Sequence, residues 1–136
     1  MNLKFKKVSE KDISLILTLF KNTFGKELSY SYYQWKYKLK KNYTAFCVYD
    51  HNTLVGHIGF KLNKFLLENK DYLLASRHTS MVNKNYRGKK IYEKLVKFSS
   101  KELEKLNVSI ILAWPNLSNL KSSLMHENFY PIMQLP

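Results

Sequence analysis

The sequence contains little cysteine, little arginine and no long apolar run, and each scarcity excludes a class of protein. Its single cysteine, Cys47, lies within the apolar run 45–48, so no disulfide forms within the chain and no cysteine cluster binds a metal. We expect this thiol to be buried and inert. No run approaches the roughly 18 apolar residues of a membrane-spanning helix, and residues 1–7 lack the apolar stretch of a signal peptide. These features predict a soluble, cytoplasmic protein with no metal and no membrane partner.

Arginine is scarce although the chain is strongly basic. The formal net charge is +13, yet only Arg77 and Arg87 carry guanidinium groups, and the lysines are spread from Lys4 to Lys121. Base-edge and bidentate phosphate recognition favour arginine, so the composition argues against a nucleic-acid partner. An AT-rich genome also produces such a lysine-rich, asparagine-rich chain. A basic nucleic-acid-binding module is an alternative that rests on net charge alone.

The length and apolar content predict one folding unit. A chain of 136 residues with 45% apolar content is long enough for one hydrophobic core and short for two. We therefore expect a single domain over residues 1–136, without an internal repeat or a linker.

The first half of the chain has the pattern of a strand, two helices and a meander. Residues 3–8 alternate apolar and basic side chains, as a half-buried strand does. Ser9 and Asp12 resemble a helix N-cap with an acidic residue three places on, and the apolar residues that follow share one helical face. The pattern predicts a strand at 3–8, helices at 9–25 and 29–39, and strands at 43–49, 54–66 and 72–83.

The second half contains the clearest helix and a buried strand. Residues 88–106 have apolar side chains on one side and lysines on the others. Residues 108–112 are almost all apolar, as expected of a strand that runs parallel to a neighbour and is covered on both faces. We predict an α/β fold with a mixed, mostly antiparallel sheet, a central right-handed strand–helix–strand crossover and flanking helices. A short helix at 118–126 and an extended piece at 129–130 follow.

The junction between the strand at 72–83 and the helix at 88–106 is the best candidate for a binding site. The first turn of a helix has unpaired backbone N–H groups and partial positive charge, which together attract anions. Gly88 lets a ligand approach the backbone closely. Arg87, Lys89, Lys90 and Lys94 add cations beside it. These residues predict a site for a diphosphate.

The run Asn85-Tyr86-Arg87-Gly88-Lys89-Lys90, followed by Ile91, resembles the Arg/Gln-x-x-Gly-x-Gly/Ala signature of the GNAT N-acetyltransferases. The order of elements resembles that family over nearly the whole chain, which implies the GNAT fold. In the family, backbone amides of the signature hold the coenzyme A pyrophosphate and the preceding strand pairs with pantetheine. The resemblance implies acetyl-CoA, or another acyl-CoA, as co-substrate. It assigns the binding of this co-substrate to Met81, Val82, Asn83, Asn85, Tyr86, Arg87, Gly88, Lys89, Lys90, Ile91 and Asn116.

Two residues depart from the signature. Asn85 stands where Arg or Gln is usual, although an amide still donates to a phosphate. Lys90 has a Cβ and a long side chain where the family has Gly or Ala. Its backbone must therefore approach the ligand differently, unless its ammonium group takes over a phosphate contact.

The family transfers the acyl group directly to an amine, which requires a polarised thioester carbonyl and a route for the amine proton. The tyrosine that often protonates the departing thiolate is replaced by Leu124, and Asn128 stands at a usual glycine. The remaining candidates for proton chemistry are His78 and Tyr130, with His57 behind them. The alternative for each is a hydrogen-bonded structural residue.

The acceptor side is expected at the aromatic helix over residues 29–39. Tyr33, Trp35 and Tyr37 are candidates for binding a sugar or an amine cation, with core packing as the alternative. The resemblance implies an N-acyltransferase that acts on an amine of a small molecule or amino sugar. The alternative function is a catalytically degenerate GNAT module that serves as an acyl-CoA-binding or interaction domain.

GNAT domains usually finish with two further strands, and residues 129–136 leave room for one. The sheet edge then stays open, a partner chain supplies the strand, or the sequence is a shortened relative of a longer enzyme. An exposed edge favours a homodimer.

Overall fold

The computed structural model describes residues 1–39, 41–114 and 130–131. The predicted helix at 118–126, Asn116, Leu124 and the C-terminal sheet edge lie outside the described residues, so the predictions made for them, the homodimer included, stay predictions. The described strands and helices are β1 (Leu3–Lys7), α1 (Ile13–Phe24), α2 (Tyr30–Gln34), β2 (Tyr43–Asp50), β3 (Thr53–Leu67), β4 (Lys70–Val82), α3 (Ile91–Glu104) and β5 (Val108–Leu112). Single turns of helix occur at η1 (Glu10–Asp12), η2 (Trp35–Leu39) and η3 (Lys84–Tyr86).

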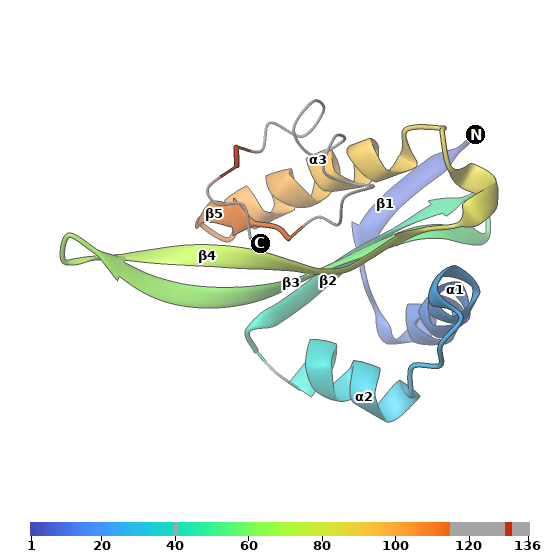
Figure 1. Cartoon of the computed structure of the whole chain (residues 1–136), viewed down its shortest axis with the longest axis horizontal. Coiled ribbons are helices and arrows are strands. Elements are labelled where there is room, and N and C mark those ends of the chain that lie inside the picture. The colour runs from blue at the N-terminus through green and yellow to red at the C-terminus, as the bar shows by residue number, and fades with distance from the viewer. Residues whose placement is uncertain (40, 115–129, 132–136) are drawn as a thin grey trace.

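The strands form one sheet in the order β1-β2-β3-β4-β5. Neighbouring strands from β1 to β4 are antiparallel, and β5 runs parallel to β4. The α3 helix joins these two parallel strands (Figure 1). The predicted mixed, mostly antiparallel sheet with a strand–helix–strand crossover is confirmed.

The helices cover the two faces of the sheet and create two cores. In Figure 1, α1 and α2 lie on one side of the sheet and α3 on the other. Because each fully buried aliphatic or aromatic side chain contributes about 1.5–3 kcal/mol, these two clusters hold the helices in place. The buried cluster under α1 and α2 consists of Ile13, Ile16, Leu19, Tyr33, Cys47, Leu54 and Met81. The cluster under α3 consists of Phe46, Val48, Val55, Ile58, Phe60, Ala75, Ile91, Leu95, Val96 and Leu103.

The predicted capping arrangement of Ser9 and Asp12 forms at η1, the single turn that leads into α1. The Asp12 carboxylate accepts hydrogen bonds from the backbone N–H and the hydroxyl of Ser9, at 2.7 and 2.6 Å. The same carboxylate accepts a hydrogen bond from the Tyr49 hydroxyl and forms an ion pair with Lys6, each at 2.7 Å. These partners lower the pKa of Asp12 to about 2 despite its burial.

The β3–β4 hairpin is long and projects from the body of the domain (Figure 1). Its turn consists of Glu68 and Asn69, whose φ angles of 48° and 59° match the left-handed pair that a two-residue hairpin turn requires. Beside the turn, Leu66 and Leu67 are exposed.

Strands β4 and β5 pair only at one end. Their register runs from Leu73 opposite Val108 to Ser76 opposite Leu112, while β4 continues to Val82. No described strand pairs with residues 77–82 on the β5 side. A bulge at Thr79, with a φ of 48°, lies within this open stretch and shifts the register between β3 and β4.

Two helix predictions need correction. The helix expected at 29–39 is α-helical only over Tyr30–Gln34 and continues as a π-helical turn over Trp35–Leu39. The helix expected from Gly88 begins at Ile91, because Gly88 and Lys90 both have left-handed backbone conformations that α-helix cannot include.

The composition predicted a buried Cys47 and no membrane-spanning helix. Cys47 is free and buried, and burial raises the pKa of its thiol to about 12. No described helix is both long enough and apolar enough to cross a bilayer.

Candidate functional site

The turn between β4 and α3 is shaped by three residues with unusual roles. The side-chain carbonyl of Asn83 accepts a hydrogen bond from the backbone N–H of Asn85 at 3.0 Å, which starts η3. Gly88 then adopts a φ of 75°, and Lys90 a φ of 57°. Apart from its own chain neighbours, no atom of the described residues lies within 4 Å of the position that a Cβ would occupy at Gly88, which leaves room for a ligand to approach the backbone.

The beginning of α3 offers backbone donors to an anion. Lys90 is the N-cap residue, and its side chain makes no capping hydrogen bond to the first turn. The 14-residue helix therefore directs its unpaired N–H groups and its positive dipole end toward the turn. Glu93 lies within this first turn, where its carboxylate also interacts favourably with the dipole.

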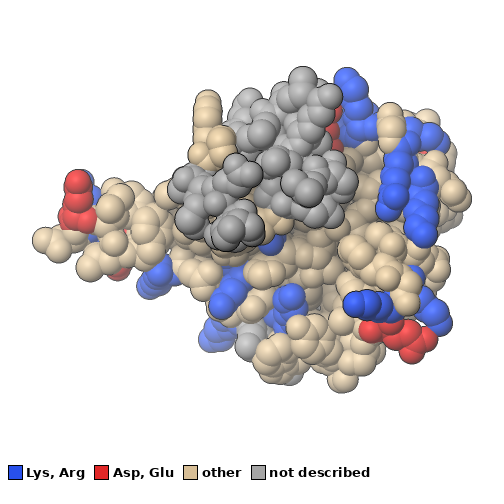
Figure 2. Space-filling model, viewed as in Figure 1, with Lys and Arg blue, Asp and Glu red and all other residues tan. Residues whose placement is uncertain are grey.

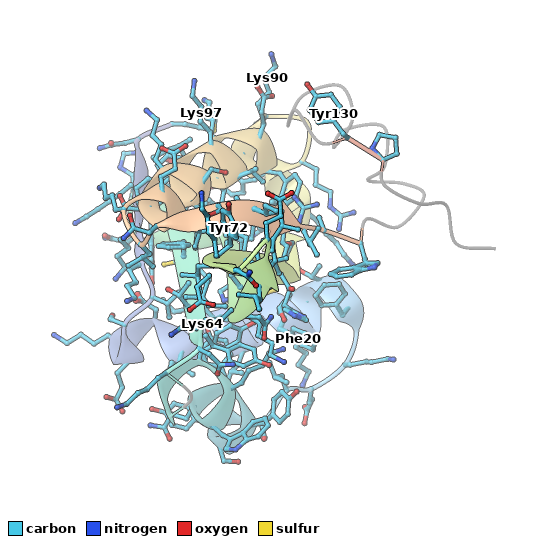
Figure 3. All side chains as sticks on the ribbon, turned by 90° about the vertical axis from the view of Figure 1, so that its left-hand side faces the viewer. Phe20, Lys64, Tyr72, Lys90, Lys97 and Tyr130 are labelled. Atoms are coloured by element: carbon cyan, nitrogen blue, oxygen red, sulfur yellow. The ribbon has the colours of Figure 1, made fainter. Side chains whose placement is uncertain are left out.

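Cationic side chains surround this turn. Lys and Arg side chains gather where α3 begins in the space-filling view (Figure 2), and Lys90 and Lys97 project outward from α3 (Figure 3). The Lys89 ammonium lies 4.8 Å from the centre of the Tyr86 ring, within cation–π range. The side chains of Lys84, Asn85, Arg87, Lys89 and Lys90 are all exposed.

A small polar pocket lies between α1 and this turn. Its volume is about 220 Å³, and the Thr23 hydroxyl beside it has no hydrogen-bond partner among the described atoms. The pocket is lined by Leu19, Asn22 and Thr23 from α1 and by Asn83, Lys84 and Asn85 from the turn. The turn therefore faces solvent on the α3 side and this pocket on the α1 side.

The upstream residues assigned to co-substrate binding lie in the open part of β4. The Met81 side chain is only 3% exposed and packs in the core under α1 and α2, so only its backbone can meet a ligand. Val82 packs against the other core, under α3. Ile91, on the far side of the turn, is also a core residue. Because their side chains pack in the two cores, these residues have only backbone groups to offer a ligand.

His57 is a buried structural residue with both ring nitrogens engaged. Its Nδ1 lies 2.9 Å from the carbonyl oxygen of Thr79, and its Nε2 lies 2.8 Å from the Tyr33 hydroxyl. Because a carbonyl only accepts, Nδ1 carries the proton, and the Tyr33 hydroxyl donates to Nε2. Burial lowers the pKa of His57 to about 4, so the ring is neutral at pH 7.

His78 lies next to the bulge and is partly exposed. It is opposite Gly59 in the register, and its ring centre lies 6.4 Å from that of Tyr43. Partial burial lowers the pKa of His78, and the charges of Lys36 and Lys61 lower it further. A neutral imidazole at this position can accept a proton.

The aromatic residues predicted for the acceptor side have three different environments. Tyr33 is 1% exposed and belongs to the core, whereas Trp35 is 45% exposed and packs on Tyr32. Tyr37 is half-buried, its hydroxyl donates to the Thr79 hydroxyl oxygen at 3.2 Å, and burial raises its pKa to about 12. The Tyr37 hydroxyl thereby contacts the bulge next to His78.

The close packing of Tyr37 depends on a glycine. A Cβ at Gly59 would lie 2.2 Å from the Tyr37 hydroxyl oxygen and 2.7 Å from two ring carbons. Gly59 therefore allows Tyr37 to lie flat against β3. Tyr130, the other candidate for proton chemistry, is 85% exposed and points away from the domain (Figure 3).

A comparison of the sequence with protein-family models identifies residues 4–123 as an acetyltransferase (GNAT) domain. The chain belongs to the GNAT acetyltransferase family. This family uses acetyl-CoA, and the match spans the β4–α3 turn described above. No protein with a curated description matches this GNAT domain in sequence.

Solved structures show the same fold at low sequence identity. Glucosamine-6-phosphate N-acetyltransferase from Arabidopsis thaliana superposes with a TM-score of 0.77 at 12% identity, covering 100% of this GNAT domain and 97% of that chain. A transcriptional regulator from Bacillus halodurans C-125 gives a TM-score of 0.83 at 14% identity, over 99% and 97% of the two chains. AAC(6')-Iy, in complex with the bisubstrate analogue CoA-S-monomethyl-acetylneamine, gives a TM-score of 0.80 at 8% identity, covering 100% of this GNAT domain and 96% of that chain.

Several features of this GNAT domain had no signal in the sequence. The left-handed conformation of Lys90 and the bulge at Thr79 occur at residues that normally avoid positive φ. The Tyr33–His57 hydrogen bond joins residues 24 positions apart. The contact of Lys36 with the ring of Tyr43 depends on how η2 packs on β2.

Proposed function

We propose that this GNAT domain is an acyl-CoA-dependent N-acyltransferase that moves an acyl group, acetyl in the first place, directly from coenzyme A to an amine of a small molecule or amino sugar. The observation that carries the proposal is the open stretch of β4, which leads from the Thr79 bulge into an uncapped helix N-terminus. A thioester with a long amide-containing arm and a diphosphate matches these two features in that order.

The diphosphate end of acyl-CoA is proposed to bind at the start of α3. The open backbone of Gly88 and the N–H groups of the first helical turn provide neutral donors. Arg87, Lys89 and Lys90 provide charge around them, and Asn85 an exposed amide. Asn116, the predicted contact at the end of β5, is proposed to bind pantetheine.

The pantetheine arm is proposed to lie along residues 77–82 of β4, whose backbone has no described partner on the β5 side. The bulge at Thr79 turns the strand at the point where the thioester would lie, so that a backbone N–H can polarise its carbonyl.

The reaction would form a C–N bond and break a C–S bond. The amine nitrogen attacks the thioester carbonyl carbon, loses a proton, and the coenzyme A thiolate leaves and takes up a proton. We propose His78 as the acceptor of the amine proton, because it is half-buried beside the bulge and its lowered pKa favours the neutral imidazole. Tyr130 is the weaker candidate, because its side chain is 85% exposed and therefore little shielded from water.

Several structural neighbours support a small amine as the acceptor. One is described as a glucosamine-6-phosphate N-acetyltransferase, and others are described as aminoglycoside acetyltransferases. Trp35 and Tyr37 are proposed to border the acceptor, while the buried side chain of Tyr33 supports them from within the core.

The alternative is a degenerate module that binds acyl-CoA without transferring the acyl group. Lys90 at the second small position of the signature and Leu124 at the usual tyrosine favour it. One experiment distinguishes the two functions. The domain is incubated with acetyl-CoA and a panel of primary amines, and the products are analysed by mass spectrometry. An acetylated amine establishes the enzyme. Saturable acetyl-CoA binding in calorimetry without any acetylated product establishes the module, and no binding up to millimolar concentration refutes both.

A further inference from the structure

Four half-buried side chains form one surface beside the bulge, on the face of the sheet that α2 covers. They are Lys36, Tyr43, Lys61 and His78, and we name them the His78 surface. Tyr43 lies opposite Lys61 in the β2–β3 register, and His78 lies opposite Gly59 in the β3–β4 register. Because paired residues and every second residue of a strand share a face, these side chains all lie on the face that Tyr37 contacts at Gly59.

Two lysines make this surface positive. The Lys36 ammonium lies 5.4 Å from the centre of the Tyr37 ring and 5.8 Å from that of Tyr43. Lys36 and Lys61 both contribute positive charge at His78. Burial also lowers the pKa of Lys36, which means that its charge is incompletely solvated.

No carboxylate balances these charges among the residues that the structure describes. Neither Lys36 nor Lys61 forms an ion pair there, while other lysines do, such as Lys6 with Asp12 and Lys21 with Glu27. In the space-filling view, the side chains visible between the hairpin and α2 include basic ones and no acidic one (Figure 2). The surface next to the proposed proton acceptor is therefore positive.

We infer that the amine acceptor of this domain carries a phosphate or carboxylate group, which the His78 surface binds through Lys36 and Lys61. The inference rests on the proposed function and names its substrate class. An anion beside the two ammonium groups compensates their incomplete solvation, and this orients the amine of the same molecule toward His78. An acceptor with several amino groups would instead add positive charge to a surface that already has an excess of it.

Matched acceptors that differ only in charge test the inference. Glucosamine 6-phosphate against glucosamine isolates a phosphate, glycine against glycinamide isolates a carboxylate, and neamine provides several amines. Binding is measured by calorimetry with coenzyme A present, and kcat/KM is measured with acetyl-CoA, so that affinity is known even where turnover is slow. We expect the anionic member of at least one pair to bind about tenfold more tightly than its neutral partner, and neamine to bind most weakly.

Variants locate the effect on the His78 surface. Lys36→Met keeps an alkyl chain over the two tyrosine rings, and Lys61→Gln keeps a polar side chain on β3. Lys64→Gln is the matched control, because Lys64 lies on the same strand and points to the opposite face. We expect Lys36→Met and Lys61→Gln to raise KM and Kd for the anionic acceptor about tenfold, with little change for the neutral one, while Lys64→Gln changes neither.

The possible outcomes separate the inference from the proposed function. Acylation of amines with no preference for anionic acceptors, or with a preference for neamine, overturns the inference and leaves the proposed function standing. A preference for anions that survives in Lys36→Met and Lys61→Gln overturns the assignment to the His78 surface. If no amine of any charge is bound or acylated, the proposed function fails, and the inference fails with it.

Discussion

Tyr33 and His57 form a buried hydrogen bond of 2.8 Å that joins α2 to β3. The bond gives His57 a fixed tautomer and holds α2 against the sheet. It thereby helps to position Trp35 and Tyr37 in η2, the turn that follows α2. His57, a candidate base in the sequence, is thereby a structural residue, and the partly exposed His78 on the neighbouring strand β4 is the histidine left for proton chemistry.

Removing the Tyr33 hydroxyl tests this bond directly. Tyr33→Phe leaves the buried Nε2 of His57 without a partner, which is expected to lower the free energy of unfolding by about 1–3 kcal/mol. Tyr32→Phe is the control, because Tyr32 is exposed and the loss of its hydroxyl leaves no buried group unpaired. Urea denaturation followed by fluorescence measures both. Equal stabilities of the two variants would show that the bond contributes nothing.

The buried His57 also makes stability depend on pH. Its pKa is about 4 in the folded chain and 6.5 in an unfolded one, so the unfolded state binds more protons between these values. The contribution of His57 to the free energy of unfolding is therefore fully present above pH 6.5. It is lost as the pH drops toward 4, by on the order of 3 kcal/mol. Denaturation curves at half-unit pH intervals measure the slope. NMR titration of the histidine signals shows whether His57 causes this slope. A His57 ring that titrates above pH 6 in the folded domain would contradict the account.

Lys90 stores backbone strain that a glycine removes. Its φ of 57° is left-handed, and this conformation costs an ordinary residue roughly 1–2 kcal/mol. We expect Lys90→Gly to raise the free energy of unfolding by about 1 kcal/mol, whereas Lys89→Gly, at a residue without positive φ, leaves it unchanged or lowers it. Thermal unfolding measures both changes. A less stable Lys90→Gly variant would mean that the Lys90 side chain makes a contribution larger than the strain.

Gly88 is the position at which a side chain should block the proposed diphosphate site. Gly88→Trp is expected to abolish acetyl-CoA binding while the domain stays folded. Gly88→Ala introduces the same backbone strain with a Cβ that meets no atom within 4 Å, so it controls for loss of stability. Calorimetry and circular dichroism measure binding and folding. Unchanged affinity in folded Gly88→Trp would show that the site lies elsewhere.

Gly59 and Tyr37 should behave as a coupled pair. Gly59→Ala places a Cβ 2.2 Å from the Tyr37 hydroxyl oxygen, and the forced shift of the ring is expected to cost about 1–3 kcal/mol. In a Tyr37→Ala background the same change should cost far less, because the ring that it displaces is gone. A double-mutant cycle in urea measures the coupling. Additive effects would contradict the packing described for these residues.

The sequence predicted the parts of the domain that depend on neighbouring residues. The cap at Ser9 and Asp12, the order of strands and helices, and the strand–turn–helix around Gly88 all follow from short-range patterns. The sequence did not predict where α3 begins, because lysine normally avoids the left-handed conformation that Lys90 adopts. Nor did it predict the positive surface at His78, since Lys36 in η2 and Lys61 in β3 come near His78 only in the folded domain.

The most direct test of the central claim is the release of free coenzyme A thiol from acetyl-CoA, measured with and without an amine acceptor. The only cysteine of the chain is buried, so a thiol reagent reports the product rather than the protein. The account predicts thiol release that depends on the amine, matches the acetylated product in amount, and is lost in Gly88→Trp. Saturating acetyl-CoA with no amine-dependent release across neutral, anionic and cationic acceptors would contradict it.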